Sequence, residues 1–134
     1  MVEVCNVDAS LHNRLSKTSA GWCVRDFMGH FVVAGTSWKH GNLSVIEEEA
    51  EALIAAIQEI ANRGFTNVVF ETDSKNVVDS INQNRVGVSE FSSLISKIKC
   101  LLSLHSSFKV NLIKRQGNMV ARCPHTCSGR HFLA

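Results

Sequence analysis

The fold is decided by the stretch VVFETDSKNVVDSI, residues 68–81. Its first three residues are β-branched or aromatic, which favours a short buried strand over a helix. The strand leads into Asp73, and either Asp73 or Ser74 is placed to cap a helix whose apolar residues recur at helical spacing. We therefore expect a strand, an acid and a helix in immediate succession.

The flanking segments add a hairpin, two more helices and further strands. Residues 26–30 form a loop with a glycine near its end between two apolar runs, which predicts a hairpin. Apolar residues from Val45 to Arg63 follow the period of an amphipathic helix, and Gly64 is a natural stop. Ser89 is placed to cap another helix with one clean apolar stripe. The predicted strands are 2–8, 22–24, 31–34, 68–70 and 108–113.

This order predicts an α/β domain with a mixed five-stranded sheet flanked by helices. The hairpin supplies the antiparallel strands, and the helices between later strands imply crossovers to parallel partners. We expect Asp8 to close the first strand. The domain is predicted to span residues 1–121, and residues 122–134, which contain Pro124 and lose the apolar period, are predicted to be an irregular tail.

Length and composition exclude several classes of protein. A chain of 134 residues is one domain, and a hydrophobic content of 45% with a single proline argues against disorder. We expect no membrane span or signal peptide, because long apolar runs are missing and the chain starts with an acidic segment. The five irregularly spaced cysteines are typical of reduced thiols, so we expect an intracellular protein, in the nucleus or the cytoplasm.

The net charge of +2 conceals an asymmetry along the chain. Residues 1–84 hold 6 Lys and Arg against 11 Asp and Glu, a net −5, whereas residues 85–134 hold 8 against 1, a net +7. This distribution suggests an anionic partner for one surface and a use for concentrated carboxylates on another. The alternative is that exposed helices merely carry these charges.

Three carboxylates are the candidates for a shared site. Asp8 and Asp73 end two strands, and the carboxyl ends of parallel strands are where ligands gather, although a strand-terminal Asp is also a common turn or cap residue. On a helical wheel Glu49 lies nearest the buried flank, whereas Glu48 and Glu51 are predicted to be solvated. Three convergent carboxylates without a neighbouring base call for a divalent cation, for which Mg²⁺ or Mn²⁺ suits oxygen ligands.

These residues resemble the acidic motifs of the ribonuclease H type 1 fold. The motifs are NVDAS at residues 6–10, EAEAL at 49–53 and ETDS at 71–74, each on the expected element. The segments GWCVRD at 21–26 and RQGN at 115–118 resemble more narrowly the plant domains related to non-LTR retrotransposon reverse transcriptases. The resemblance covers nearly the whole chain.

The resemblance implies cleavage of the RNA strand of RNA/DNA hybrids by two metal ions, Mg²⁺ or Mn²⁺. Asp8, Glu49 and Asp73 match the catalytic, metal-binding acids of the family. The partner would be nucleic acid and not a membrane, and we expect a monomer. The residues expected to contact nucleic acid are Ser10, Ser74, Lys114, Arg115 and Asn118.

The chain departs from the family pattern in ways that keep alternatives open. Arg122 stands where the family commonly has a fourth carboxylate, which favours a module that binds nucleic acid or protein with weak or no catalysis. Another kind of nucleotide-binding α/β domain is the weaker alternative, since the sequence has no glycine-rich phosphate loop. Cys123, His125, Cys127 and His131 have the residue types of a zinc site, but a ragged tail explains them equally well.

Overall fold

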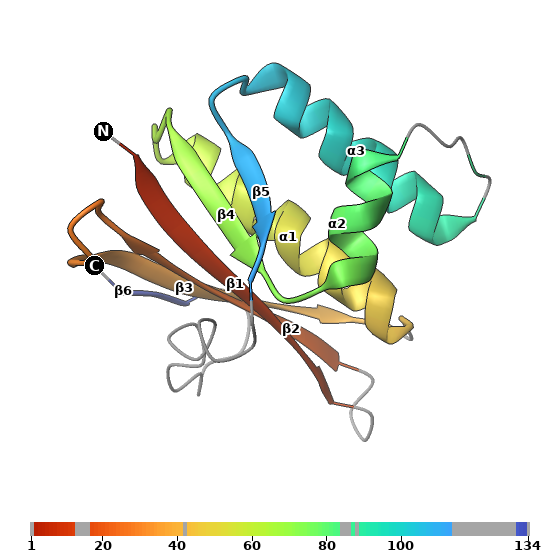
Figure 1. The fold of residues 1–134 in the computed structure, drawn as a ribbon. Helices are drawn as coiled ribbons and strands as arrows, with labels where there is room; N and C mark the ends of the chain where they lie inside the picture. Colours follow the sequence, from red (N-terminus) through yellow and green to blue (C-terminus); the bar gives the residue numbers. More distant parts are fainter. Residues whose placement is uncertain are drawn as a thin grey trace.

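The computed structural model describes residues 2–12, 17–41, 43–83, 87, 89–113 and 131–133. Six strands form one sheet in the order β5-β4-β1-β2-β3-β6 (Figure 1). The strands are β1 (Glu3–His12), β2 (Lys17–Arg25), β3 (Phe31–His40), β4 (Val68–Thr72), β5 (Lys109–Leu112) and β6 (His131–Leu133). The helices are α1 (Val45–Asn62), α2 (Lys75–Asn82) and α3 (Glu90–Leu104). The predicted mixed sheet is confirmed, since β1 pairs antiparallel with β2 and parallel with β4.

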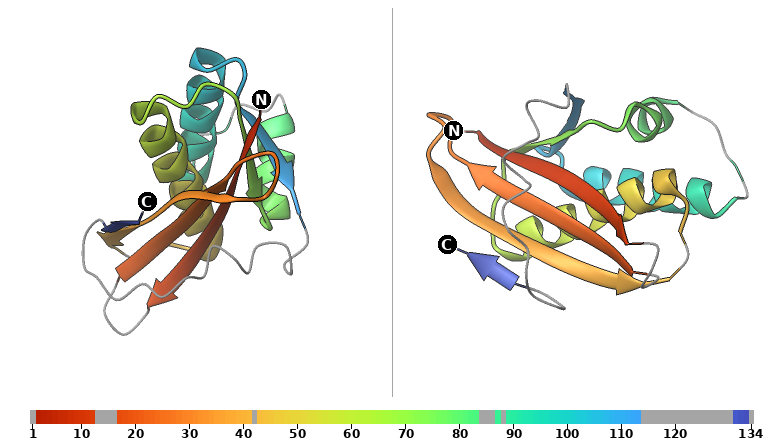
Figure 2. Two further views of the ribbon diagram at one scale, coloured as in Figure 1. Left: turned by 90° about the vertical axis from the view of Figure 1, so that its left-hand side faces the viewer. Right: turned by 90° about the horizontal axis from the view of Figure 1, so that it is seen from below.

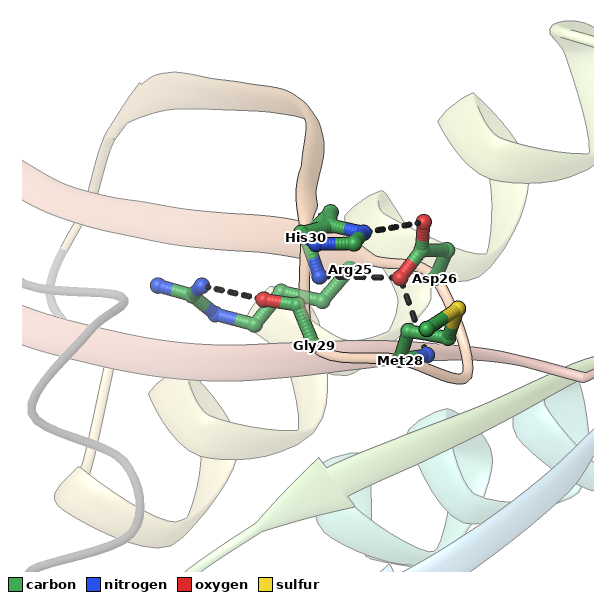
Figure 3. Close-up of polar contacts among 5 residues, drawn as sticks. All are labelled: Arg25, Asp26, Met28, Gly29 and His30. Carbon is green, nitrogen blue, oxygen red and sulfur yellow. Dashed lines mark hydrogen bonds and ion pairs between the residues drawn. The ribbon is translucent and has the colours of Figure 1, made fainter.

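The turn between β2 and β3 is held by Asp26. One of its carboxylate oxygens accepts hydrogen bonds from the backbone N–H groups of Met28 and His30, at 2.9 and 2.8 Å (Figure 3). These contacts, the His30 N–H first, keep the pKa of Asp26 below its usual value. Gly29 has a φ of 87°, which is accessible to glycine at little cost, and its carbonyl accepts from Arg25. The predicted hairpin is therefore confirmed, with strands longer than expected.

Helix α1 begins at a capping box. The Ser44 hydroxyl oxygen accepts from the Glu47 N–H, and the Glu47 carboxylate accepts from the Ser44 N–H at 3.0 Å. The Ser44 hydroxyl also donates a hydrogen bond to the Glu47 carboxylate. This bond first, and then the bond from the Ser44 N–H, lowers the pKa of Glu47. At the other end Arg63 is the C-cap and Gly64 has a φ of 89°. The boundaries predicted from periodicity are thus confirmed to within one residue.

The core lies between the sheet and α1, on which α3 packs. Figure 2 shows the helices stacked on one side of the twisted sheet. Phe70 of β4 is fully buried and meets Phe108 edge-on, with ring centroids 5.3 Å apart. Trp22 of β2 is also buried, and the Arg63 guanidinium lies 5.8 Å from its ring centroid. No helix within the described residues is long and apolar enough to cross a bilayer.

Two sequence predictions about the strands are wrong. Asp8 does not close β1, which continues to His12 because Ala9 to His12 pair with β2 beyond the end of β4. The irregular tail is contradicted at residues 131–133, which form β6 and pair antiparallel with β3. The sheet consequently has six strands in place of five. Periodicity does not reveal a three-residue edge strand, because its pairing with β3 depends on the tertiary fold.

Candidate metal and nucleic-acid site

The parallel pairing of β1 with β4 sets the position of the first acid. Asn6 is in register with Glu71, and its side-chain amide donates to the Glu71 carboxylate at 2.7 Å. These two side chains therefore lie on one face of the sheet. Asp8 comes two residues later on β1, so it projects from the same face, next to the carboxyl end of β4. The side chain of Asp8 is partly exposed.

Asp73 occupies the turn between β4 and α2. The preceding Thr72 hydroxyl accepts from the Ser74 N–H, and the Ser74 hydroxyl accepts from the Val77 N–H. Ser74 is therefore the N-cap, and it is buried with 3% of its surface exposed. The Ser74 side chain thus serves as the helix cap. Asp73, the acid of this turn, is partly exposed.

The third group of acids begins α1. Glu47 belongs to the capping box, Glu48 is buried with 4% of its surface exposed, and Glu49 is partly exposed. Burial first, and then the negative charges of Glu49 and Asp8, raise the pKa of Glu48 to about 7. The charges of Asp8 and Glu49 thus act on one buried carboxyl. Strand β1 and the start of α1 therefore lie close enough for the charges of their acids to interact.

The burial of Glu48 corrects the sequence prediction that this side chain is solvated. The wheel assumed one narrow apolar stripe, but Ala52 and Ala56 are also buried. They lie four and eight residues after Glu48 and share its side of the helix. The alanines widen the buried face of α1 toward Glu48. This row of small residues is the signal in the sequence that identifies Glu48.

The described acids do not form a closed metal cage. Among the residues whose placement is described, no three Asp, Glu, His or Cys side chains gather closely enough to hold one metal ion. The charges of Asp8 and Glu49 act on Glu48, but neither these three acids nor Asp73 with any of them form such a group among the described residues. For Ser10 the structure describes the backbone alone, which lies in β1. Lys114, Arg115, Asn118 and Arg122 lie outside the described residues.

The chemistry of the acids fits a hard cation. One carboxylate oxygen of Glu48 is buried without a hydrogen-bond partner among the described atoms. Such an oxygen is costly unless a cation or a proton neutralises it. Oxygen ligands of this kind are those preferred by Mg²⁺ and Mn²⁺. A divalent cation would relieve the repulsion among Asp8, Glu48 and Glu49.

Comparisons with known proteins agree with the fold. The sequence profile of the reverse transcriptase-like family matches residues 6–124. The chain belongs to this family. No curated protein sequence matches it. The family match and the solved structures described next confirm the resemblance of the sequence to ribonuclease H-like domains.

Solved structures show how widely this fold is shared. Ribonuclease H1 from the halophilic archaeon Halobacterium salinarum NRC-1 is 20% identical and superposes with a TM-score of 0.78, over 90% of this chain and 92% of that one. LC11-ribonuclease H1, from compost, was solved with an RNA/DNA hybrid; it is 18% identical, with a TM-score of 0.75 over 89% and 90% of the chains. The ribonuclease H domain of a Mycobacterium tuberculosis protein has a TM-score of 0.74 and 18% identity, over 90% of this chain and 93% of that one. At these identities the likeness shows the fold.

Proposed function

We propose that this reverse transcriptase-like domain hydrolyses the RNA strand of RNA/DNA hybrids with the help of two divalent metal ions, Mg²⁺ or Mn²⁺. The observation that carries the proposal is the placement of the acids. Asp8 lies on β1, in electrostatic contact with the start of α1, while Asp73 follows the neighbouring parallel strand β4. The family match and the hybrid-bound ribonuclease H1 structure support the same activity.

Asp8, Glu49 and Asp73 are the residues that we assign to metal binding. When bound, the metal ions would activate a water molecule and stabilise the departing oxygen of a phosphodiester. The partly exposed positions of all three side chains leave room for substrate and water. With a metal ion bound, the buried Glu48 would add negative charge to that of Asp8 and Glu49, the two acids whose charges act on it.

Substrate binding is assigned to residues around these acids. Ser10 follows Asp8 on β1 by two positions. Lys114, Arg115 and Asn118 follow β5, the strand next to β4, and belong to the part of the chain with a net charge of +7. A hybrid duplex would be recognised by shape, 2′-hydroxyls and phosphates, without reading of sequence.

A second candidate is a module that binds hybrids without cleaving them. It is favoured by the finding that no three acids in the described part of the chain lie close enough to hold a metal ion together. Arg122 at the place of the family's fourth acid points the same way. In that case affinity would depend on salt and not on divalent metal.

Cleavage and binding assays distinguish the two candidates. A hybrid labelled on its RNA strand is incubated with wild-type protein, Asp8→Asn or Glu49→Gln, in Mg²⁺ and in Mn²⁺. Glu51→Gln is the matched control, because it removes the same charge two residues along α1. We expect the first two variants to lose at least about 100-fold in rate, the order of one important electrostatic contact in a transition state. Salt-sensitive binding with no cleavage by wild-type protein in either metal would establish the binding module.

A further inference from the structure

A small hollow lies between α2, the helix that follows Asp73, and α3. Ser80 from α2 and Ser96 and Lys99 from α3 give it polar walls, while Phe91 and Ile95 form an apolar wall. Its volume is about 70 Å³. Since a water molecule takes up about 30 Å³ in the liquid, the hollow has room for one small tetrahedral anion.

Lys99 is fixed at the edge of this hollow. Its ammonium group donates to the backbone carbonyl of Gln83, the residue that caps the C-terminus of α2. An ammonium group has three N–H donors, so this contact leaves further donors for a ligand. Because the side chain is already held, binding would cost less side-chain entropy than binding by a freely moving lysine.

The remaining lining groups suit an oxyanion. Hydroxyl groups from Ser80, Ser92 and Ser96 can each donate a hydrogen bond, and no carboxylate is among the lining residues. The nearest acids along the two helices are Asp79, which is paired with Lys75 at 2.7 Å, and Glu90. Apolar Phe91 and Ile95 exclude water from one side, which strengthens the attraction between an ammonium group and an anion.

We propose that this hollow, defined by Ser80, Ser92, Ser96 and Lys99, binds a phosphate group of the nucleic-acid strand held at the acids. The assignment to a strand rests on the proposed function. Asp73 lies two residues before α2, and Ser80 lies five residues after its first residue, Lys75, which is about 7.5 Å along the helix at 1.5 Å per residue. That helix length equals about two nucleotide steps at 3.4 Å per step. A strand passing Asp73 could therefore place a phosphate in the hollow.

The first experiment uses inorganic phosphate alone. Backbone amide signals of ¹⁵N-labelled protein are followed by NMR while phosphate is added at constant ionic strength. We expect saturable shifts at Ser80, Ser96 and Lys99 in the wild-type protein and their loss in Lys99→Gln. Lys97→Gln is the matched control, because it removes the same charge from the same helix outside the hollow. The absence of saturable shifts in wild-type protein would overturn the proposal.

The second experiment tests whether the phosphate belongs to a strand. Hybrid affinity is measured against salt concentration for the wild-type protein and for the Lys99→Gln, Lys99→Arg and Lys97→Gln variants. One lost phosphate contact lowers the salt slope by about 0.7 to 0.9. We expect that decrease in Lys99→Gln and not in Lys97→Gln, with recovery in Lys99→Arg. Thermal melting of each variant verifies that it is folded.

A neutral methylphosphonate placed at single positions of the hybrid locates the contact. We expect one position, about two to three nucleotides from the site of cleavage, at which the substitution weakens wild-type binding but not Lys99→Gln binding. Equal salt slopes for wild type and Lys99→Gln would overturn the assignment to a strand, even if free phosphate binds. These readouts measure binding, so a chain that binds hybrids without cleaving them would still satisfy the proposal while the hydrolytic function fails.

Discussion

At the scale of single residues, Glu48 links the electrostatics of the site to the stability of the protein. Its pKa is about 7 in the folded chain and 4.5 as an ordinary glutamate, so the folded state holds this proton more tightly. The metal-free protein should therefore lose stability as the pH rises from about 4.5 through 7, by up to about 3 kcal/mol from this group. Equilibrium urea unfolding in EDTA at several pH values measures the loss.

Glu48→Gln should remove most of that dependence, because the amide keeps the shape of the side chain and cannot ionise. The variant should be more stable than the wild type at pH 8 and similar to it at pH 4.5. If the pH profiles of the variant and the wild type have the same slope, Glu48 does not carry the buried charge.

Glu49 is expected to distinguish metal binding from general charge effects. Mn²⁺ that binds only the folded protein raises its stability by about 2.7 kcal/mol at a concentration 100 times the dissociation constant. The melting temperature of wild-type protein should rise accordingly, and Glu49→Gln should lose most of this rise. An equal rise in Glu49→Gln and in Glu51→Gln would show that Mn²⁺ acts elsewhere.

Single residues also mark the limit of sequence-based prediction of the site. Strand ends and a helical wheel point to Asp8, Glu49 and Asp73 as candidates, because those patterns are local. The helical wheel places Glu48 in solvent, because a wheel centred on one apolar stripe ignores the small residues beside that stripe, which can also be buried. Its burial depends on how closely α1 approaches β1 and β2, which a single helix does not encode.

At the scale of elements, the capping box of α1 positions the acids at its start. Ser44→Ala removes the hydroxyl that accepts from the Glu47 N–H and should cost about 1 kcal/mol in the free energy of unfolding. Ser103→Ala, at an exposed position inside α3, is the control and should change stability by less than about 0.5 kcal/mol. Chemical denaturation measures both, and a loss of equal size in the control would contradict the role of the cap.

Strand β4 depends on Phe70, whose ring is fully buried against Phe108. Phe70→Ala should cost about 3 to 5 kcal/mol, whereas Phe70→Leu, which keeps most of the apolar volume, should cost clearly less. Unfolding curves give both values. A cost below about 1 kcal/mol for Phe70→Ala would show that the core around Phe70 repacks, or that it is less tightly packed than in the structure.

Element types followed from the sequence more reliably than element ends. Helices α1 and α3 were predicted from their caps and period, because both signals lie within the element. The end of β1 was misplaced at Asp8, since the pairing of β1 with β2 outlasts its pairing with β4. Asp8 is therefore the point where one neighbour of β1 ends, and this edge is what exposes its carboxylate.

At the scale of the whole molecule, near-neutrality results from two opposed regions. The acids of β1, α1 and the turn after β4 come from residues 1–84, with a net charge of −5, and residues 85–134 carry +7. Lys99 and the hollow between α2 and α3 belong to the second region. We assign the metal ions to the acidic region and the phosphates to the basic one.

The release of RNA fragments from an RNA/DNA hybrid tests the central claim most directly. Wild-type protein and Asp73→Asn are compared in Mg²⁺, in Mn²⁺ and in EDTA, with the RNA strand labelled. Metal-dependent hydrolysis predicts fragments from wild-type protein in at least one of the two metals, none in EDTA, and a loss of at least about 100-fold in Asp73→Asn. Cleavage of equal rate by wild type and Asp73→Asn, or no cleavage in either metal, would contradict it.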